Sequence, residues 1–257
     1  MISIAIVNRK GGTGKTTTAL AMASGLVRKR KKVLAIDLDP QCNFSTVSRT
    51  EKDVIGVREL LMRAKGITIE DAIQHREGSY DLICADPLLS AADKQLNQLG
   101  AEEELRYALG KLTSHYDYIV VDTPPHQGIL TLNALIAADE VIMAVHADSF
   151  STAGIMGIYQ NIEAVRERRN AGLRIAGILV CRFNGRTQHG KFQLKQLRKL
   201  ADAMQTKVYA ATIRENVALE EAATAKESIW EYDAASHGAE DYDAFLKEFL
   251  EGRDGKP

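Results

Sequence analysis

Residues 2–17 read ISIAIVNRKGGTGKTT, an apolar run followed by a glycine-rich stretch and then by a lysine and two threonines. The apolar run has the composition of a strand that is buried on both faces of a sheet. Gly11, Gly12 and Gly14 let backbone N–H groups close around phosphate oxygens without a Cβ in the way. A helix that begins directly after them adds the positive end of its dipole. This order of features predicts a phosphate-binding loop, and favours it over a plain glycine turn between a strand and a helix.

The side chains after the glycines predict how a nucleotide is held. Lys15 can reach the β- and γ-phosphates, and the Thr16 hydroxyl can ligate Mg²⁺. The common form of this loop, G-x-x-x-x-G-K-[ST], requires glycine where this chain has Arg9. The loop is therefore a variant, with a second lysine at its start. The predicted phosphate-binding residues are Lys10, Gly11, Gly12, Thr13, Gly14, Lys15, Thr16 and Thr17.

Beyond this loop, short apolar runs alternate with longer helical patterns along the whole chain. The alternation is typical of βαβ units, so we predict an α/β fold with a doubly wound, mostly parallel sheet and helices on both faces. The chain has no linker rich in Gly, Pro or Ser, which favours a single domain, residues 1–257. Strands are predicted at Ile2–Val7, Lys32–Ile36, Tyr80–Ala85, Tyr116–Val121, Glu140–His146, Ile175–Cys181 and Lys207–Ala210. Helices are predicted at Lys15–Arg30, Leu130–Ala138, Thr152–Asn170 and Lys191–Met204.

Composition and charge exclude several classes of protein. The 257 residues include 33 Lys and Arg against 34 Asp and Glu, a net charge of −1, and 45% are hydrophobic. These values exclude bulk disorder and a wholly basic nucleic-acid coat. Three cysteines without C-x-x-C spacing argue against a disulfide framework or a zinc site and favour a reducing compartment. Since no apolar run reaches about 18 residues and no signal peptide is present, the sequence predicts a cytoplasmic protein.

Three aspartates are placed to serve the same nucleotide. Asp122 ends an apolar strand, and α/β folds bind ligands at the carboxyl ends of their strands, so its carboxylate is predicted to hold Mg²⁺ directly or through water. Asp37 and Asp39 follow another buried strand. The pair suggests that Asp37 lies near the magnesium shell and that Asp39 orients or activates the attacking water. The alternatives are a helix cap at Asp122 and a turn before Pro40 at the other two positions.

Several segments together resemble those of one family. K-G-G-T-G-K-T-T (residues 10–17) resembles the deviant Walker A motif of the ParA/MinD ATPases, D-L-D-P-Q-C-N (37–43) resembles their D-x-D-P-Q-x-N segment, and Tyr118–Pro125 resembles their Walker B strand. Thr212–Val217, with Glu221-Ala222 and Ser236–Ala239, resembles the C-terminal pattern of the ParA and Soj partition proteins. The resemblance covers nearly the whole chain. It implies the deviant Walker A type of P-loop NTPase fold and a role in partitioning a chromosome or a plasmid.

The resemblance also implies a mechanism. It implies a weak, Mg²⁺-dependent ATP hydrolase that forms a homodimer with ATP sandwiched between the subunits. Lys10 would reach the phosphates of the partner subunit, which makes Lys10, Lys15 and Asp39 the expected catalytic residues. The dimer would bind DNA nonspecifically and associate with the nucleoid, and a ParB-like centromere-binding protein would stimulate hydrolysis and release. Because the chain begins at its first strand, no N-terminal DNA-reading domain is expected.

The part of the site that would contact the base is predicted from the same resemblance. Arg182 follows the sixth strand, and Ile213 and Arg214 lie in a segment that is near the adenine in relatives. Many relatives have proline at the position of Arg214. The N-K-x-D motif of GTPases is absent, which favours ATP as the nucleotide.

A basic segment, residues 182–199, gives independent support for DNA binding. It contains six Lys and Arg residues and no acidic residue. Nonspecific DNA binding is mostly phosphate neutralisation, whereas the alternative interpretation is a solvated helix face. A second basic run, residues 28–32, is explained by the dipole of the helix that it ends. The predicted DNA-binding residues are Arg186, Lys191, Lys195, Arg198 and Lys199.

Two other functions known among such ATPases are open alternatives. A MinD-like or other positioning ATPase that acts on a membrane would need a C-terminal amphipathic helix with a basic polar face. Residues 241–251 carry an apolar stripe, but their polar positions are mainly acidic, so we predict packing against the domain and no membrane partner. An iron–sulfur reductase would need paired cysteines at a dimer axis. Cys84 and Cys181 each end a strand and are predicted to be buried apolar residues.

Overall fold

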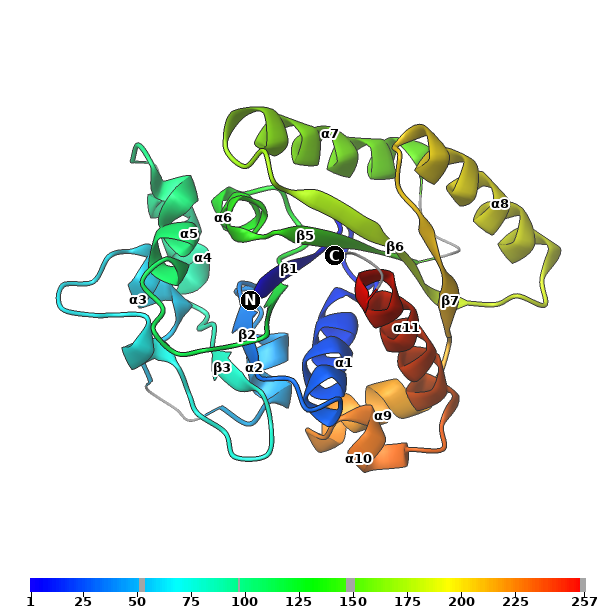
Figure 1. Cartoon of the computed structure of the whole chain (residues 1–257), viewed down its shortest axis with the longest axis horizontal. Helices are drawn as coiled ribbons and strands as arrows, with labels where there is room; N and C mark the ends of the chain where they lie inside the picture. Colours follow the sequence, from blue (N-terminus) through cyan, green and yellow to red (C-terminus); the bar gives the residue numbers. More distant parts are fainter. Residues whose placement is uncertain (51–53, 97, 147–150, 255–257) are drawn as a thin grey trace.

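A computed structural model describes residues 1–50, 54–96, 98–146 and 151–254. Its strands, in chain order, are β1 (Ile2–Val7), β2 (Val33–Asp37), β3 (Asp81–Ile83), β4 (Tyr118–Asp122), β5 (Glu140–His146), β6 (Arg174–Phe183) and β7 (Val208–Arg214). They form one seven-stranded sheet in the order β3-β2-β4-β1-β5-β6-β7 (Figure 1). All the pairings between these named strands are parallel, which confirms the predicted fold class and makes the sheet more regular than the mostly parallel one expected.

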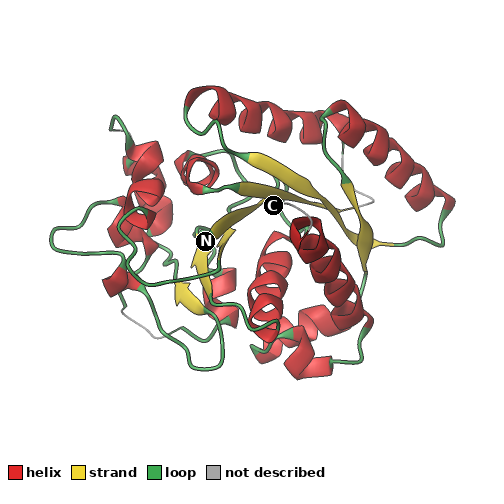
Figure 2. Cartoon of the chain, viewed as in Figure 1, coloured by secondary structure: helices red, strands yellow, loops and turns green. Residues whose placement is uncertain are grey.

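Helices cover both faces of this sheet (Figure 2). The helices are α1 (Lys15–Arg28), α2 (Asn43–Val47), α3 (Val57–Leu61), α4 (Leu89–Gln95), α5 (Glu104–Leu109), α6 (Ile129–Ala137), α7 (Thr152–Arg168), α8 (Gln188–Ala203), α9 (Val217–Ala225), α10 (Ile229–Asp233) and α11 (His237–Asp254). Short 3-10 turns lie at Glu70–Ala72 and Ala101–Glu103. Helices α1, α9, α10 and α11 lie together on one side of the sheet, and α6, α7 and α8 lie on the other (Figure 1).

Two apolar layers, one on each face, form the core. Side chains of a strand point alternately to the two faces. In β1, Ile4 and Ile6 therefore pack in the layer of α1, α10 and α11, whereas Ala5 and Val7 pack in the layer of α5 to α8. Because both faces are covered, the strands are nearly continuous in apolar residues, which is the pattern that the sequence shows.

The register of the central strands brings the end of β2 beside the end of β4. Asp37 lies opposite Asp122 in the β2–β4 pair, and Ile6 lies opposite Asp122 in the β1–β4 pair. Since the strands are parallel, their carboxyl ends meet at the same edge, and the loop of residues 8–14 leaves β1 at this edge. Strand order changes direction around β1 and β4, and α/β sheets bind ligands at such a point.

Helix α11 packs along β7 and α1 (Figure 1). Glu248 accepts hydrogen bonds from the backbone N–H groups of Ala210 and Ala211 in β7, at 2.8 and 3.1 Å. Near the end of the helix, Arg253 forms an ion pair with the mostly buried Glu140 of β5. The apolar stripe is buried in the core, at Tyr242, Phe245, Leu246 and Phe249. These contacts confirm that the tail packs against the sheet. In the described ranges, no helix is both long enough and apolar enough to cross a bilayer.

Several boundaries differ from the predicted ones. Helix α8 begins at Gln188, three residues before the predicted start at Lys191, because the Thr187 hydroxyl caps it by accepting a hydrogen bond from the Gly190 N–H at 3.0 Å. Strand β7 continues to Arg214, where the prediction ended at Ala210, because these additional residues still pair with β6. The helices α2 to α5, α9 and α10 were not predicted. With five to nine residues each, they show too few turns for a clear period.

Candidate active site

The loop between β1 and α1 is shaped by two glycines with positive φ. Gly12 has φ +71° and Gly14 has φ +89°, a conformation that residues with a Cβ rarely adopt. A Cβ at Gly14 would also lie 3.1 Å from the Sγ of Cys181, so the loop passes close to the end of β6. Lys10, Gly11 and Gly12 are exposed, which leaves the loop open to a ligand.

Asn8 fixes the start of this loop. Its side-chain amide donates to the carbonyl of Ala144 in β5 at 2.6 Å, and its side-chain oxygen accepts from the Lys10 N–H at 3.0 Å. The buried Thr13 hydroxyl donates to the Lys10 carbonyl at 3.3 Å. Our sequence interpretation missed Asn8. The sequence does contain a signal for this role, because an asparagine between a strand and a glycine turn commonly forms hydrogen bonds with the nearby backbone.

Lys15 begins α1 and is 6% exposed. Its Nζ donates to the Lys10 carbonyl at 3.3 Å, so the ammonium lies within the loop. Burial lowers the pKa of Lys15, and the nearby carboxylates of Asp122 and Asp39 act in the opposite direction. The structure thus brings the predicted phosphate-binding lysine and two of the predicted aspartates together.

Asp37 is fully buried and accepts three hydrogen bonds. The donors are the Asp39 N–H at 3.0 Å, the Ser45 N–H at 2.9 Å and the Ser45 hydroxyl at 2.7 Å. Burial raises the pKa of Asp37 to about 6, and the hydrogen bonds from Ser45 oppose this shift. Asp39 is 6% exposed, and one of its oxygens accepts the Gln41 N–H at 3.0 Å. Both aspartates therefore make the turn contacts that were the alternative interpretation, and both also lie at the site. Ser45 was not predicted, because its contact forms only when α2 folds back on β2.

Asp122 differs from both. It is fully buried, and within the described part of the chain no donor meets either of its oxygens at full hydrogen-bond geometry, although the Thr16 hydroxyl lies nearby. Burial and the neighbouring Asp37 raise the pKa of Asp122 well above its ordinary value, whereas the Thr16 hydroxyl and the Lys15 ammonium favour the charged form. Buried polar atoms without a partner are uncommon, because each costs free energy. The carboxylate of Asp122 is therefore available to bind a ligand.

The residues around Asp122 fit a magnesium ion. Carboxylate and hydroxyl oxygens are the hard ligands that Mg²⁺ prefers, and it takes one or two carboxylates together with phosphate oxygens. Asp122, Asp37 and Thr16 supply that set. Among the described residues, no group of three or more His, Cys, Asp or Glu side chains could hold a metal ion. The site therefore suits an ion that arrives with a nucleotide better than one bound by protein alone.

The residues predicted to contact the base lie where β6 and β7 end. Arg182 has φ +53° and pairs with Glu215 and Glu220 at 3.0 and 3.3 Å. Ile213 is a core residue, 2% exposed, in the layer shared with α1 and α11. The Arg214 guanidinium donates to Asp241 and Glu240 of α11. All three residues are at the predicted edge of the sheet, but α11 already holds the guanidinium of Arg214.

The basic segment forms the end of β6 and most of α8. Lys191, Lys195 and Arg198 recur at helical spacing and share a face of α8, followed by Lys199. Arg182 is paired with acids, as described above. By contrast, the five predicted DNA-binding residues are exposed and make no ion pair with any described residue: Arg186, Lys191, Lys195, Arg198 and Lys199. Cys84 and Cys181 are buried, 5% and 2% exposed, as predicted.

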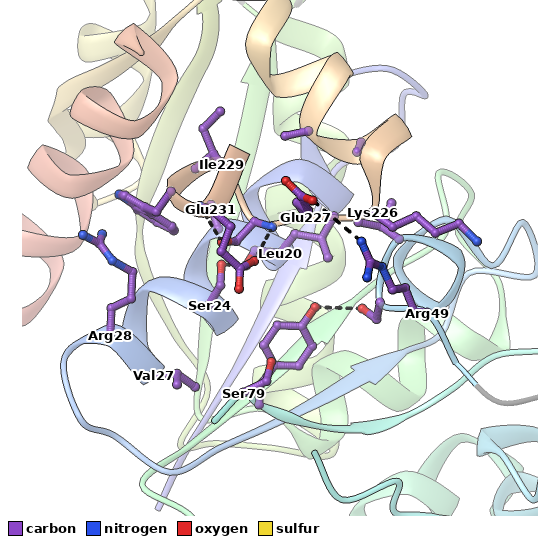
Figure 3. A pocket seen from close by; sticks show the side chains of 18 of the residues that line it. Leu20, Ser24, Val27, Arg28, Arg49, Ser79, Lys226, Glu227, Ile229 and Glu231 are labelled. Carbon is purple, nitrogen blue, oxygen red and sulfur yellow. Dashed lines mark hydrogen bonds and ion pairs between the residues drawn. The ribbon is translucent and has the colours of Figure 1, made fainter. Parts of the chain in front are cut away.

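A separate cavity of about 680 Å³ runs along α1 between α2, α9 and α10 (Figure 3). It reaches Thr17, but the loop glycines, Lys15 and the three aspartates do not line it. Two side chains that line it donate to backbone carbonyls: the Ser24 hydroxyl donates to the Leu20 carbonyl at 2.6 Å, and Arg49 donates to the Ala225 carbonyl at 3.1 Å. This cavity is therefore not the candidate phosphate site.

Comparison with known proteins agrees with this geometry. A family model described as an AAA domain matches residues 1–175. The chromosome-partitioning ATPase Soj of Thermus thermophilus is 37% identical over 249 residues, covering 96% of this chain and 94% of the relative.

Two solved structures with bound nucleotide analogues share the fold. Cobyrinic acid a,c-diamide synthase from Mycobacterium smegmatis, solved with an ATP analogue and magnesium, has a TM-score of 0.81 and 28% identity, covering 98% of this chain and 97% of that one. A plasmid partition protein of Borrelia burgdorferi bound to AMPPNP has a TM-score of 0.79 and 26% identity, covering 98% and 99%. With these matches and the site described above, the chain belongs to the ParA/Soj family of partitioning ATPases.

Proposed function

We propose that this chain binds ATP with Mg²⁺ at the loop between β1 and α1, dimerises around it and then binds DNA without sequence preference. A ParB-like partner stimulates hydrolysis and release, and the cycle drives DNA segregation. The observation that carries the proposal is the convergence of the buried Lys15 with Asp37, Asp39 and Asp122 beside the glycine loop.

Phosphoryl transfer depends on charge neutralisation and an aligned nucleophile. Lys15 supplies a cation inside the loop, and Thr16, Asp37 and Asp122 would hold Mg²⁺. When bound, the ion would neutralise charge on the β- and γ-phosphates. Asp39, which uses one oxygen for the Gln41 N–H, orients the attacking water. Relatives with bound ATP analogues support the nucleotide assignment.

The proposed dimer is formed through the loop. Lys10 lies in its exposed part, where its side chain can reach the phosphates bound by a second subunit. A cation supplied by a partner subunit would stabilise charge in the transition state in the same way as an arginine finger. Because both nucleotides then lie between the subunits, ATP binding and dimer formation support each other.

The proposed DNA contact is the exposed cationic face of α8. Its Lys and Arg side chains make no ion pair within the described residues, so phosphates do not compete with internal acids for them. Nucleoid association follows from such contacts. The MinD-like alternative has less support, because the apolar stripe of α11 is buried in the core.

DNA binding in four nucleotide states tests this proposal. Fluorescence anisotropy on a random-sequence duplex should show binding with ATP and with a slowly hydrolysed analogue, and little with ADP or without nucleotide. Lys15→Ala should lose ATP binding by calorimetry and stay monomeric with ATP, because the phosphates lose their main cation. Equal DNA affinity in all four states, or near-normal ATP affinity in Lys15→Ala, would contradict the proposal.

A further inference from the structure

A hydroxyl pair joins α11 to the first turns of α1. The Oη of Tyr242 lies 3.1 Å from the Oγ1 of Thr18, three residues after Lys15. Thr18 is 0% and Tyr242 1% exposed, so water does not compete for either hydroxyl. The Sγ of Cys181 lies 3.8 Å from the Thr18 hydroxyl, on the side facing Gly14. All three side chains are buried, and they contact one another beside the first turn of α1, which follows the phosphate loop.

Asp241, the residue before Tyr242, fixes the first part of α11 to the sheet. Asp241 accepts hydrogen bonds from the backbone N–H of Arg214 at 2.8 Å and from its guanidinium at 2.6 to 3.0 Å. Charge-assisted pairs of this kind have specific geometry. Tyr242 therefore extends from a helix turn whose position is set by β7.

Farther along α1, away from the loop, the two helices meet through the exposed ion pair of Arg28 with Asp243, at 3.1 Å, and through apolar packing. A Cβ at Gly25 would lie 2.2 Å from the Cδ1 of Leu246, so the helices touch closely there. Apolar packing tolerates small sliding movements, whereas a buried hydrogen bond requires a particular distance and angle. The Tyr242–Thr18 pair is thus the directional contact between α11 and the part of α1 that adjoins the loop.

We propose that Tyr242 is a positioning residue for the nucleotide site: through Thr18 it fixes the first turn of α1 and holds Lys15 and Thr16 where they meet the phosphates. This inference rests on the proposed function, because it assigns Tyr242 to the same site. Burial raises the pKa of Tyr242 well above its ordinary value, so its hydroxyl stays neutral over the physiological range.

A double-mutant cycle on nucleotide affinity tests this role. Tyr242→Phe and Thr18→Val each remove one hydroxyl of the pair, and each should weaken binding of Mg²⁺-ADP and of a slowly hydrolysed ATP analogue by roughly 3–10-fold, the range of one buried hydrogen bond. The double variant should bind no more weakly than either single variant, because the same interaction is lost only once. Thr18→Ser keeps the hydroxyl and should retain wild-type affinity. Isothermal calorimetry gives the affinities.

The matched control is Tyr209→Phe. Tyr209 is also buried, and its ring packs edge-to-face on Phe245 with 4.9 Å between the ring centroids. It lies on β7, away from the phosphate loop. This variant should keep wild-type nucleotide affinity. If Tyr242→Phe lowers the melting temperature but binds nucleotide as the wild type does, or if the two single effects multiply in the double variant, Tyr242 is only a core residue and the inference is wrong. A wild-type chain that binds no nucleotide would overturn the proposed function, and this inference with it.

Discussion

Asp37, Asp39 and Asp122 share one edge of the sheet but differ in what their oxygens already bind. Asp37 accepts three hydrogen bonds, Asp39 accepts one from the Gln41 N–H, and Asp122 accepts none at full hydrogen-bond geometry from the described residues. A carboxylate that is already bound is held in place, whereas one without a partner is available to a ligand. Substitutions at the three positions should therefore have distinct effects.

Asp39→Ala should separate nucleotide binding from hydrolysis. Lys15, Thr16, Asp37 and Asp122 remain in place, so ATP and Mg²⁺ should still bind. Hydrolysis should slow by roughly 100-fold, because the group that orients water is lost. The ATP-bound dimer should then accumulate, which light scattering can detect. Hydrolysis at the wild-type rate would assign the water-orienting role to another residue.

Asp122→Asn should stabilise the nucleotide-free protein while weakening Mg²⁺-dependent nucleotide binding. Removing a buried, unpaired carboxylate should raise stability at pH 7 by about 1–2 kcal/mol, or roughly 2–8 °C in melting temperature. The folded-state pKa of Asp122 is raised, so the wild type loses stability as pH rises above the unfolded value. The gain should therefore shrink as the pH falls toward 4, near the ordinary value of 3.8, where the unfolded state also begins to take up the proton.

Thermal melts of nucleotide-free protein from pH 4 to pH 8 measure this effect. Asp202→Asn is the control, because Asp202 is exposed on α8 and should change little at any pH. A gain that is constant across pH, or a loss of stability at pH 7, would show that the Asp122 carboxylate is not a source of instability.

At the level of elements, the sequence predicts those features whose signal is local. The apolar runs predict the strands because both faces of the sheet are covered, and the glycines and Lys15 predict the loop because they are contiguous. The contact of Tyr242 with Thr18 joins residues 224 positions apart and leaves no local pattern, and the contact of Ser45 with Asp37 depends on how α2 packs against the end of β2. The same reason applies to Arg214, whose partners on α11 are not visible from its own segment.

Helix α8 and the loop before it, which contains Arg186, give an element-level prediction. Replacing Arg186 and Lys195 by glutamate should weaken ATP-dependent DNA binding for all sequences alike, because phosphate contacts carry no base information. If each residue contacts one phosphate, a dimer loses about four contacts, and the slope of log K against log salt should flatten by about 3–4. Nucleotide affinity should not change, since the loop adjoins a different helix. Fluorescence anisotropy at several salt concentrations with saturating ATP measures both.

The double variant Lys29→Glu/Lys31→Glu controls for overall charge. It produces the same change in net charge at the exposed end of α1, where the basic residues are explained by the helix dipole. It should leave the salt slope unchanged. If the α8 variant also leaves affinity and slope unchanged, residues 182–199 are a solvated helix face and the partition role rests on the ATPase site alone.

At the scale of the whole molecule, α11 joins the edge strand β7 to β5, two places further into the sheet. It is held near its start by Arg214 of β7 and near its end by the pair of Arg253 with Glu140 of β5. Arg253→Met leaves the mostly buried Glu140 carboxylate with the exposed Arg174 as its one ion-pair partner among the described residues, so we expect a loss of about 2–3 kcal/mol, or roughly 4–12 °C in melting temperature.

Lys247→Met is the matched control on the same helix. Lys247 pairs with Glu251, and both side chains are more than half exposed, so the loss should be within about 2 °C. Differential scanning calorimetry compares the two variants. Equal small losses would mean that the contact of Arg253 with Glu140 does not stabilise the fold.

The contact of Glu248 with β7 has a consequence for assembly. Strand β7 ends the sheet, and an edge strand with unpaired N–H groups is a template on which a second chain can add a strand, which leads to aggregation. The Glu248 carboxylate occupies two of these N–H groups and places a negative charge beside them. A second copy that added a strand to β7 would have to displace the Glu248 carboxylate from these two N–H groups, which opposes continuation of the sheet at this edge.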